Sequence, residues 1–295
     1  MNSNGIEALK TQIQQDFPDL VINSIKVIGT GWHHNAVDIN GSIIFRIPHH
    51  TYGHDITPVT VNYETELLKR LKGKVPVSIP DPRYIAPNND YFGYPKLSGV
   101  LLQDITPVFN QEDWQYLKKD WVAIASAIHQ NVSINVARSL KIPDFEQPGP
   151  HAVERIFSLP NISSEVLYFA STIIEQVKTR NKDTEQHVFI HNDLQFHNIL
   201  ADPKTKRITG LIDWTDACVG PLAREFSIDE WMQEGLLKEV AKLYEEKTGI
   251  HVDVQQAFMW RSFEELGDYV EEIESKEVEE AAKTLKRIKH LITTK

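Results

Sequence analysis

The sequence predicts an α+β protein with two lobes, a small antiparallel sheet followed by a larger helical region. Three observations support this fold class. The chain has 295 residues, which is long for one compact domain. Short apolar segments separated by Gly and Asn-Gly turns fill its first part, whereas apolar residues after Trp114 recur at helical spacing. We therefore expect residues 1–98 to form one lobe and residues 99–295 the other.

The first lobe is expected to contain an N-terminal helix, a strand-rich segment and one inserted helix. "IEALKTQIQQDF" has helical spacing and stops at a proline. In "AVDINGSIIFRI", Asn40 and Gly41 separate two apolar strands, and both residue types tolerate the positive φ of a tight hairpin. "VTVNYETELLKRLKGK" has the apolar positions Leu67, Leu68 and Leu71 of an amphipathic helix, and "DYFGYPKLSGVLL" returns to a strand and a loop.

The second lobe is predicted to be mostly helical. Helical spacing is present in "WQYLKKDWVAIASAIHQ", in "SSEVLYFASTIIEQVKTRN" and in the long C-terminal segments that begin at "REFSIDEW" and "VDVQQAFMW". Between them, "FIHNDLQFHNIL" and "TGLIDW" each begin as a short apolar strand and continue into polar residues. We expect these two strands to pair as a hairpin, which would bring their polar ends together.

Composition and charge limit the function classes. The net charge of −10 argues against nucleic-acid binding, which needs clustered Lys and Arg. It is compatible with a cationic ligand, although a solvated acidic surface is the plainer explanation. Cys218 is the single cysteine, and we expect a small buried residue in a reducing compartment. No apolar run approaches about 18 residues and no secretory pattern is present, so we expect a cytoplasmic monomer without membrane contact.

The polar ends of the two predicted strands carry residues suited to phosphoryl transfer. Asp193 and Asn198 follow the first strand, and Asp213 follows the second. Aspartate and asparagine supply hard oxygen ligands for Mg²⁺, which prefers few protein ligands together with phosphate oxygens. A further aspartate outside the metal site is able to accept the proton of a hydroxyl group. A base, two metal ligands and an anion-holding loop are the parts that phosphoryl transfer requires.

Two other interpretations of this segment are a zinc site and a structural polar loop. His187, His191 and His197 are the candidate zinc ligands. Their spacing does not converge on a strand and loop, no cysteine lies nearby, and the sequence lacks an HExxH helix. Cys218 lacks the surroundings that activate a thiolate, which argues against a cysteine nucleophile.

The motif "HNDLQFHNIL" followed by "GLIDWTDA" resembles the signature of the antibiotic kinases, the aminoglycoside and macrolide phosphotransferases with a protein-kinase-like fold. The resemblance extends to "INSIKVIGTGWHHNAVDIN" at the nucleotide-covering loop and "IIFRIP" at the strand with a basic residue. It also includes "YETELLKRL" at the helix with a partner glutamate and "FGYPKLSGVLL" at the hinge. It runs from about residue 18 to the C-terminus, and the two catalytic motifs are its specific part.

The resemblance implies a role for each residue of the catalytic segment. Asp193 would be the catalytic base for the acceptor hydroxyl, and His191 would support the catalytic loop. Asn198 and Asp213 would hold the Mg²⁺ ions that bridge the nucleotide phosphates.

The resemblance also implies a nucleotide site. Arg46 would contact the α- and β-phosphates, and Glu64 would orient Arg46, with Glu66 as the rival for that role. Gly29 and Gly31 would let the backbone approach the phosphates closely, although "GTG" alone is more often an ordinary turn.

The hinge Pro95, Lys96 and Leu97 would offer backbone groups to the base of a GTP or ATP donor. Two features depart from the family pattern. Most kinases have lysine where this chain has Arg46, and Glu225 is the only acid near the position of a further family aspartate.

The function that the resemblance implies is antibiotic phosphorylation. We expect a macrolide 2′-phosphotransferase, because the segments "RIP", "IDWTDA" and "EGLLKEVAKLYEEKTG" resemble that branch of the family. An aminoglycoside phosphotransferase, a metabolite kinase on the same fold and a nucleotide-binding pseudokinase are the alternatives. A macrolide needs a mostly apolar site, and the segments "FSIDEWMQEGLL" and "AFMWRSFEELGDYV" are rich in aromatic residues and Met. Such stripes are more typical of a core than of a ligand pocket.

Overall fold

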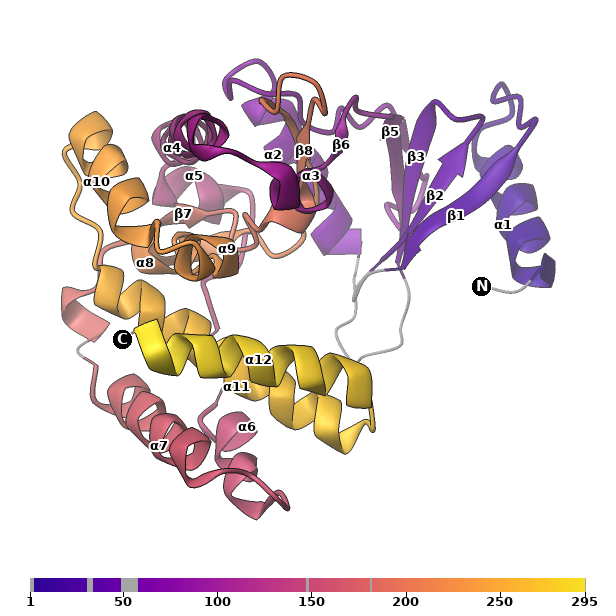
Figure 1. Ribbon diagram of the computed structural model, residues 1–295. Helices are drawn as coiled ribbons and strands as arrows, with labels where there is room; N and C mark the ends of the chain where they lie inside the picture. The colour runs from indigo at the N-terminus through magenta and orange to yellow at the C-terminus, as the bar shows by residue number, and fades with distance from the viewer. Residues whose placement is uncertain (1–2, 31–33, 49–57, 147–148, 181, 295) are drawn as a thin grey trace. The chain divides into compact units, whose positions relative to one another are not determined.

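Figure 1 shows the computed structural model of the chain, which describes residues 3–30, 34–48, 58–146, 149–180 and 182–294. The chain forms two compact units. The first unit comprises Met1–Leu117, Gln130–Pro143 and Phe196–Ala217, and the second comprises Lys118–His129, Asp144–Gln195 and Cys218–Lys295. Each unit is built from three separate segments of the chain. The predicted division into one lobe of residues 1–98 and another of residues 99–295 therefore stays a prediction.

A five-stranded antiparallel sheet dominates the first unit. Its strands are β1 (Ile25–Thr30), β2 (His34–Ile39), β3 (Ile43–Pro48), β4 (Tyr84–Ile85) and β5 (Phe92–Pro95), in the order β1-β2-β3-β5-β4. Asn40 and Gly41 connect β2 to β3 with φ values of 58° and 71°. This confirms the predicted hairpin, because the turn needs positive φ at both positions.

The two faces of this sheet have different partners. One face packs in a core with helix α1 (Ser3–Asp16), where Val37 and Phe45 are fully buried beside Ile13. Alternation of side chains sends Ala36 and Arg46, which are opposite each other in the β2–β3 pair, to the other face.

Helix α2 (Pro58–Leu71) is the predicted inserted helix, and its apolar face is buried. Leu67, Leu68 and Leu71 are all 0% exposed, as the helical spacing predicted. The side chain of Glu64 on the same helix is also buried and contacts Arg46 of β3.

The strand pairing around "FIHNDLQFHNIL" differs from the predicted hairpin. In the first unit, β8 (Ile199–Ala201) pairs with β9 (Ile208–Leu211) and with β6 (Val100–Leu101). In the second unit, β7 (His187–Ile190) pairs instead with β10 (Cys218–Pro221). The prediction that β7 pairs with β9 was therefore wrong. The three-residue strand β8 directly follows polar residues, which is too short a signal to be recognised as a separate strand.

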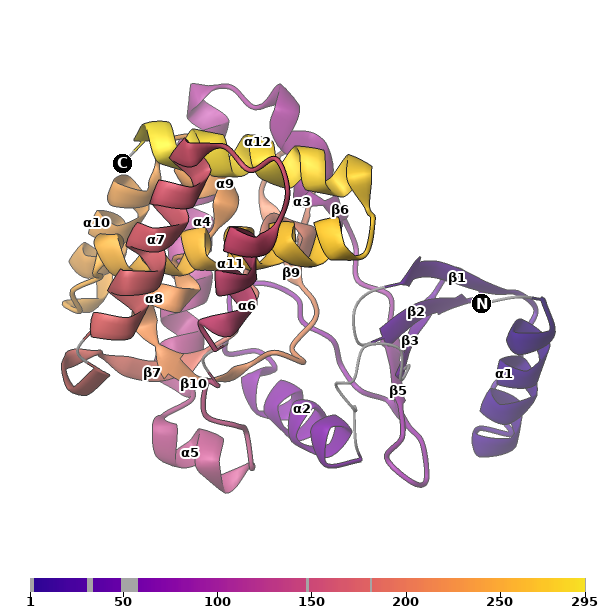
Figure 2. The same cartoon turned by 90° about the horizontal axis from the view of Figure 1, so that it is seen from below.

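Helices make up most of the second unit. The long helices are α7 (Ser164–Thr179), α10 (Leu237–Thr248), α11 (Val254–Glu274) and α12 (Val278–Thr294), with the short helices α6 (His151–Glu154), α8 (Leu222–Glu225) and α9 (Asp229–Gln233). Helix α11 packs against α12, α7 and α8, and Figure 2 shows α12 beside α11. The long helix α4 (Gln111–Asn131) has residues in both units, and α3 (Leu102–Ile105) and α5 (Ile134–Ser139) are short helices of the first.

The predicted helices of the C-terminal segments are present, but they are divided. A left-handed Gly249 at φ 73° ends α10, and a left-handed Lys276 at φ 63° separates α11 from α12. None of the helices in the described part of the chain combines the length and the apolar character that crossing a bilayer requires.

Candidate active site

Arg46 is the centre of a buried polar cluster in the first unit. Its side chain is 6% exposed, and its guanidinium forms ion pairs with Glu64 and with Oδ1 of Asp213, the latter at 2.5 Å. Nη2 also donates to Oγ1 of Thr215 at 2.6 Å and lies 3.2 Å from Nδ1 of His34. The cluster joins strands β2 and β3, helix α2 and the segment after β9. The planar fork of arginine allows one side chain to hold several partners at once.

Charge keeps this cluster together against the cost of burial. Burial opposes the charge of Arg46, but Asp213 and Glu64 raise its pKa above the ordinary value, so Arg46 remains charged. Burial also raises the pKa of Glu64 to about 7, although the positive charge of Arg46 counteracts this shift. The cluster therefore contains a permanent cation with a carboxyl group that titrates near neutral pH.

The structure distinguishes the two candidate partners of Arg46. Glu64 is 1% exposed and contacts Arg46. Glu66 is about half exposed and pairs with Lys69 on the same helix at 2.7 Å. Glu64 rather than Glu66 is thus the residue that contacts Arg46.

The β8–β9 hairpin brings Asn198 and Asp213 together. The backbone N–H of Ile212 donates to the carbonyl oxygen of Asn198 at 2.9 Å, which fixes the start of one strand beside the end of the other. Asn198 is 6% exposed. Asp213 adopts a left-handed φ of 59°, and its side chain is 42% exposed. A non-glycine residue in this region is uncommon and is found disproportionately at functional sites.

In the second unit, Glu225 holds the backbone at His191 and Asn192. Its carboxylate accepts hydrogen bonds from the N–H groups of His191 at 3.0 Å and Asn192 at 2.9 Å, and lies 3.3 Å from Nε2 of His129. Burial alone would raise the pKa of Glu225, but the hydrogen bond and charge of His129 and the neighbouring His191 hold it below its usual range. Glu225 is therefore a buried carboxylate that braces the turn before Asp193.

Other contacts brace the same loop on both sides of Asp193. Arg224 donates from Nη2 to the side-chain oxygen of Asn192 at 3.2 Å, where the backbone is left-handed at φ 66°. The indole N–H of Trp121 donates to the carbonyl of Leu194 at 3.3 Å. These contacts fix the backbone around the half-buried Asp193.

The remaining predicted residues are placed as follows. Gly29 lies opposite Ala36, and a Cβ added there would be 3.8 Å from the Cβ of Ala36, so the local packing does not itself require glycine. Gly31 lies outside the described residues. Lys96 follows β5, and its N–H donates to the carbonyl of Ser42 at 2.9 Å. Asp193 belongs to the second unit, whereas Asn198 and Asp213 belong to the first.

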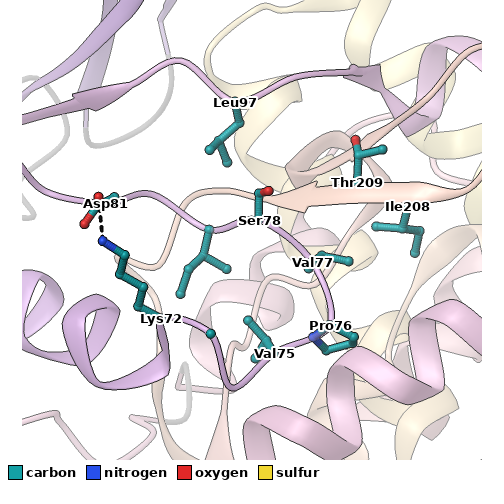
Figure 3. A pocket seen from close by; sticks show the side chains of 11 residues that line it. Lys72, Val75, Pro76, Val77, Ser78, Asp81, Leu97, Ile208 and Thr209 are labelled. Carbon is teal, nitrogen blue, oxygen red and sulfur yellow. Dashed lines mark hydrogen bonds and ion pairs between the residues drawn. The ribbon is translucent and has the colours of Figure 1, made fainter.

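Figure 3 shows a surface hollow of about 800 Å³ in the first unit, which is distinct from the Arg46 cluster. It contains one ion pair, between Lys72 and Asp81 at 2.8 Å, and the side chain of Leu97 points into it. Its lining residues are Lys72, Gly73, Val75, Pro76, Val77, Ser78, Ile79, Asp81, Leu97, Ile208 and Thr209. None of these except Leu97 was predicted to bind a ligand.

Two alternatives from the sequence are also located by the structure. Cys218 is 4% exposed on β10, as expected of a small buried residue. His187 and His191 lie in the second unit and His197 in the first. Among the residues that the structure describes, no group of three His, Cys, Asp or Glu side chains is arranged to hold a metal ion.

Sequence reasoning missed His34 and Thr215 in the Arg46 cluster and His129 beside Glu225. A usable signal existed for His34, because it lies two residues before Ala36 on the strand that pairs with β3, and so shares the face of Arg46. Thr215 and His129 contact their partners only through the tertiary fold, so no local pattern marks them.

Comparison with known proteins identifies the family and the fold. A family model described as "Phosphotransferase enzyme family" matches residues 24–245. The GDP complex of a mutant aminoglycoside 2′-phosphotransferase-IIIa is similar in structure, with a TM-score of 0.79 and 22% identity over 97% of each chain. A GDP and kanamycin complex of APH(2″)-IIIa has a TM-score of 0.76 and 20% identity over 96% of this chain and 98% of that chain.

A macrolide 2′-phosphotransferase of type I is also similar, with a TM-score of 0.68 and 20% identity over 96% of both chains. These identities support the predicted protein-kinase-like fold and do not select between the two acceptor classes. Since the family model spans most of the chain and contains Arg46, Glu64, Asp193, Asn198 and Asp213, the chain belongs to the phosphotransferase enzyme family, and the protein is a phosphotransferase.

Proposed function

We propose that the protein transfers the γ-phosphoryl group of GTP or ATP to a sugar hydroxyl of an antibiotic. The observation that carries this proposal is the Arg46–Glu64–Asp213 cluster. It combines a permanently charged guanidinium with a carboxylate at the end of a strand hairpin, as binding of nucleotide phosphates requires. Nucleotide complexes among the structural relatives are consistent with it.

The residues present also fit Mg²⁺. Asn198 and Asp213 supply side-chain oxygens from one hairpin, and the exposed fraction of the Asp213 side chain leaves it accessible to an ion. Mg²⁺ is commonly held by one or two such protein groups together with phosphate oxygens. When bound, it would neutralise developing charge on the phosphates.

Asp193 is proposed as the group that receives the proton of the acceptor hydroxyl. Its position follows from the bracing of His191 and Asn192 by Glu225, which fixes the backbone immediately before it. A rigid support of this kind is what a general base needs, because small displacements of the base reduce its effect.

Two acceptor classes are candidates. The macrolide candidate rested on the resemblance of three short segments, and the aromatic and Met stripes of the C-terminal segments were expected to be core. Trp231, Met232, Met259 and Trp260 are indeed buried at 0–5% exposure. These side chains fill the interior of the second unit, so they do not form an apolar surface for a macrolide.

A specific observation bears on an aminoglycoside. Helix α11 presents Glu264, Asp268 and Glu271 on one face at helical spacing. The side chains of Glu264 and Asp268 are 27% and 51% exposed. Glu264 pairs with Arg224 and Arg261, and Oδ2 of Asp268 lies 3.8 Å from Arg261, so these arginines already neutralise part of the charge that would attract the ammonium groups of an aminoglycoside.

Transfer of labelled phosphate by the purified protein tests the proposal directly. We would combine GTP or ATP and Mg²⁺ with kanamycin, erythromycin or no acceptor, and identify the product by mass spectrometry. A phosphorylated drug is expected. Transfer to kanamycin alone would favour the aminoglycoside, transfer to erythromycin alone would favour the macrolide, and transfer to neither would contradict an antibiotic acceptor.

A further inference from the structure

The sheet face that carries Arg46 also carries a second buried charge. Asp38 of β2 is 8% exposed. Its Oδ2 accepts a hydrogen bond from Nζ of Lys96 at 2.7 Å, whereas its Oδ1 is buried without a hydrogen-bond partner. Buried carboxylate oxygens are normally satisfied, because desolvation without a compensating hydrogen bond is costly. Oδ1 has no donor from the protein, so a donor from a ligand or a bound water molecule has to satisfy it.

The position of Asp38 relative to Arg46 matches the layout of a nucleotide. Asp38 is opposite Ile44 in the β2–β3 pair, just as Ala36 is opposite Arg46, so both charged side chains lie on the same face. These positions are two residues apart along each strand, which is about 7 Å. Lys96 directly follows β5, the neighbour of β3, at the segment proposed to meet the base. Asp38 thus lies beyond Arg46 in the direction of that segment.

The Lys96–Asp38 contact alone does not explain why Asp38 is buried. The Lys96 side chain is 44% exposed and the Asp38 side chain is 9% exposed. Ion pairs with an exposed partner contribute little to stability, because water competes for the charge. The other lysine near Asp38, Lys26 of β1, is exposed. A role in ligand recognition accounts for a buried acceptor better than a role in stability does.

The order of polar atoms at this site matches the edge of guanine. Nζ of Lys96, Oδ2 and then Oδ1 of Asp38 present a donor followed by two acceptors. Guanine presents O6 as an acceptor, followed by the donors N1–H and N2–H₂. Adenine instead places its donor amine against the donor Lys96 and its acceptor N1 against an acceptor oxygen of Asp38. A carboxylate with two adjacent donors is also among the stronger hydrogen-bonding arrangements.

We propose that Asp38 and Lys96 recognise the base of the nucleotide donor and give the protein a preference for guanine over adenine. This proposal rests on the proposed nucleotide-dependent function, and it assigns Asp38 a specificity role that the catalytic motifs do not imply. Asp38 contributes the two acceptors for N1–H and N2–H₂, and Lys96 contributes the donor for O6.

Calorimetric titration of the intact protein with Mg²⁺ complexes of four nucleotides tests this proposal. GTP carries all three groups, ITP lacks the N2 amine, XTP has an acceptor in place of that amine, and ATP has the opposed pattern. Asp38→Asn replaces one acceptor with an amide donor at nearly constant volume. Asp81→Asn is the matched control, because it breaks another Lys–Asp pair of the same unit, at the hollow of Figure 3.

The wild-type protein should bind GTP about 10- to 100-fold more tightly than ATP, with ITP between them. Asp38→Asn should lose most of this preference and bind XTP more tightly than the wild type does, because the amide donates to the xanthine oxygen. Asp81→Asn should retain the wild-type order. Thermal unfolding of the ligand-free variants checks that they fold. If Asp38→Asn is unfolded, Lys96→Gln replaces it. Lys96→Gln should weaken the binding of GTP and ITP but not the binding of ATP.

Equal affinity of the wild type for GTP and ATP would overturn the proposal, as would equal changes for both nucleotides in Asp38→Asn and Lys96→Gln. These results would leave the nucleotide-dependent phosphotransferase function intact. Failure of the folded wild type to bind any of the four nucleotides would instead contradict the proposed function, and this proposal with it.

Discussion

Glu64 in the first unit and Glu225 in the second are both buried carboxylates beside predicted functional residues, but their pKa values shift in opposite directions. Glu64 contacts Arg46, which it shares with Asp213, and burial raises its pKa to about 7. Glu225 accepts two backbone N–H groups in addition to contacting His129, and its pKa lies below the usual range. Burial alone therefore does not determine the charge of a carboxyl group, because the number and type of its donors decide the outcome.

The difference also separates two kinds of function. The partner of Glu64 is the side chain of Arg46, whose charged planar fork is suited to phosphate. The partners of Glu225 are mainly backbone groups, which hold a loop in one conformation. We infer that Glu64 tunes binding, whereas Glu225 fixes the geometry of the catalytic loop.

Among the substitutions that separate the two regions, Asp213→Asn is expected to reduce kcat the most. This change removes the negative charge of a proposed Mg²⁺ ligand, and with it one of the two carboxylates that contact Arg46. Loss of metal-assisted charge stabilisation should reduce kcat about 10³-fold. Steady-state kinetics over a range of Mg²⁺ concentrations measures it, and activity within threefold of the wild type would exclude Asp213 as a required ligand.

A smaller loss is expected from Glu225→Gln. Gln keeps the length of the side chain, but its amide nitrogen faces one of the donors that now bond to the carboxylate. Misplacement of Asp193 should lower kcat about 10²-fold while leaving the Kd for nucleotide unchanged. Glu225→Asp tests whether an aspartate can brace the loop as well. A change confined to nucleotide affinity would show that Glu225 does not act through the loop.

Arg46→Lys should have a more modest effect, confined mainly to nucleotide binding. Lysine keeps the charge but loses the fork that contacts Glu64, Asp213 and Thr215 together. The Kd for nucleotide should rise about tenfold, which corresponds to about 1.4 kcal/mol. Glu66→Gln, which changes only the exposed pair with Lys69, is the control and should have no effect. Equal nucleotide affinity in wild type and Arg46→Lys would contradict a role for the fork.

The smallest expected difference between Glu64 and Glu225 lies in how each makes the stability of the protein depend on pH. Glu64 has a folded-state pKa of about 7, above its ordinary value of 4.5. The unfolded chain loses this proton first, so stability falls as pH rises from about 4.5 to 7. Glu225 has a lowered pKa, so its contribution is present above the ordinary value and is lost as pH falls through the folded-state pKa.

Urea denaturation of the wild type, Glu64→Gln and Glu225→Gln between pH 4 and 8 measures these trends. Glu64→Gln should flatten the decline toward neutral pH by about 1–3 kcal/mol. Glu225→Gln should instead remove stability at neutral pH that the wild type loses in acid. The same pH profile for all three proteins would show that neither group is perturbed.

Part of this arrangement is visible in the sequence because local rules govern it. The Asn40-Gly41 hairpin and the buried Leu67, Leu68 and Leu71 follow from turn chemistry and helical spacing. The motif around Asp193 identified the family. The pairing of β7 with β10 was not predicted, because a strand of four residues ending in Gly220 and Pro221 has little strand signal. The role of Glu225 depends on that pairing, since α8 begins where β10 ends.

The most direct test of the central claim compares wild type with Asp193→Asn in two assays on the same samples. Calorimetry measures binding of the Mg²⁺–nucleotide complex, and ³¹P NMR follows transfer to the acceptor drug that the wild type uses. The account predicts unchanged nucleotide affinity with transfer reduced about 10²- to 10⁴-fold, because only the proton acceptor is lost. Transfer by Asp193→Asn at the wild-type rate would contradict a catalytic loop built around this aspartate.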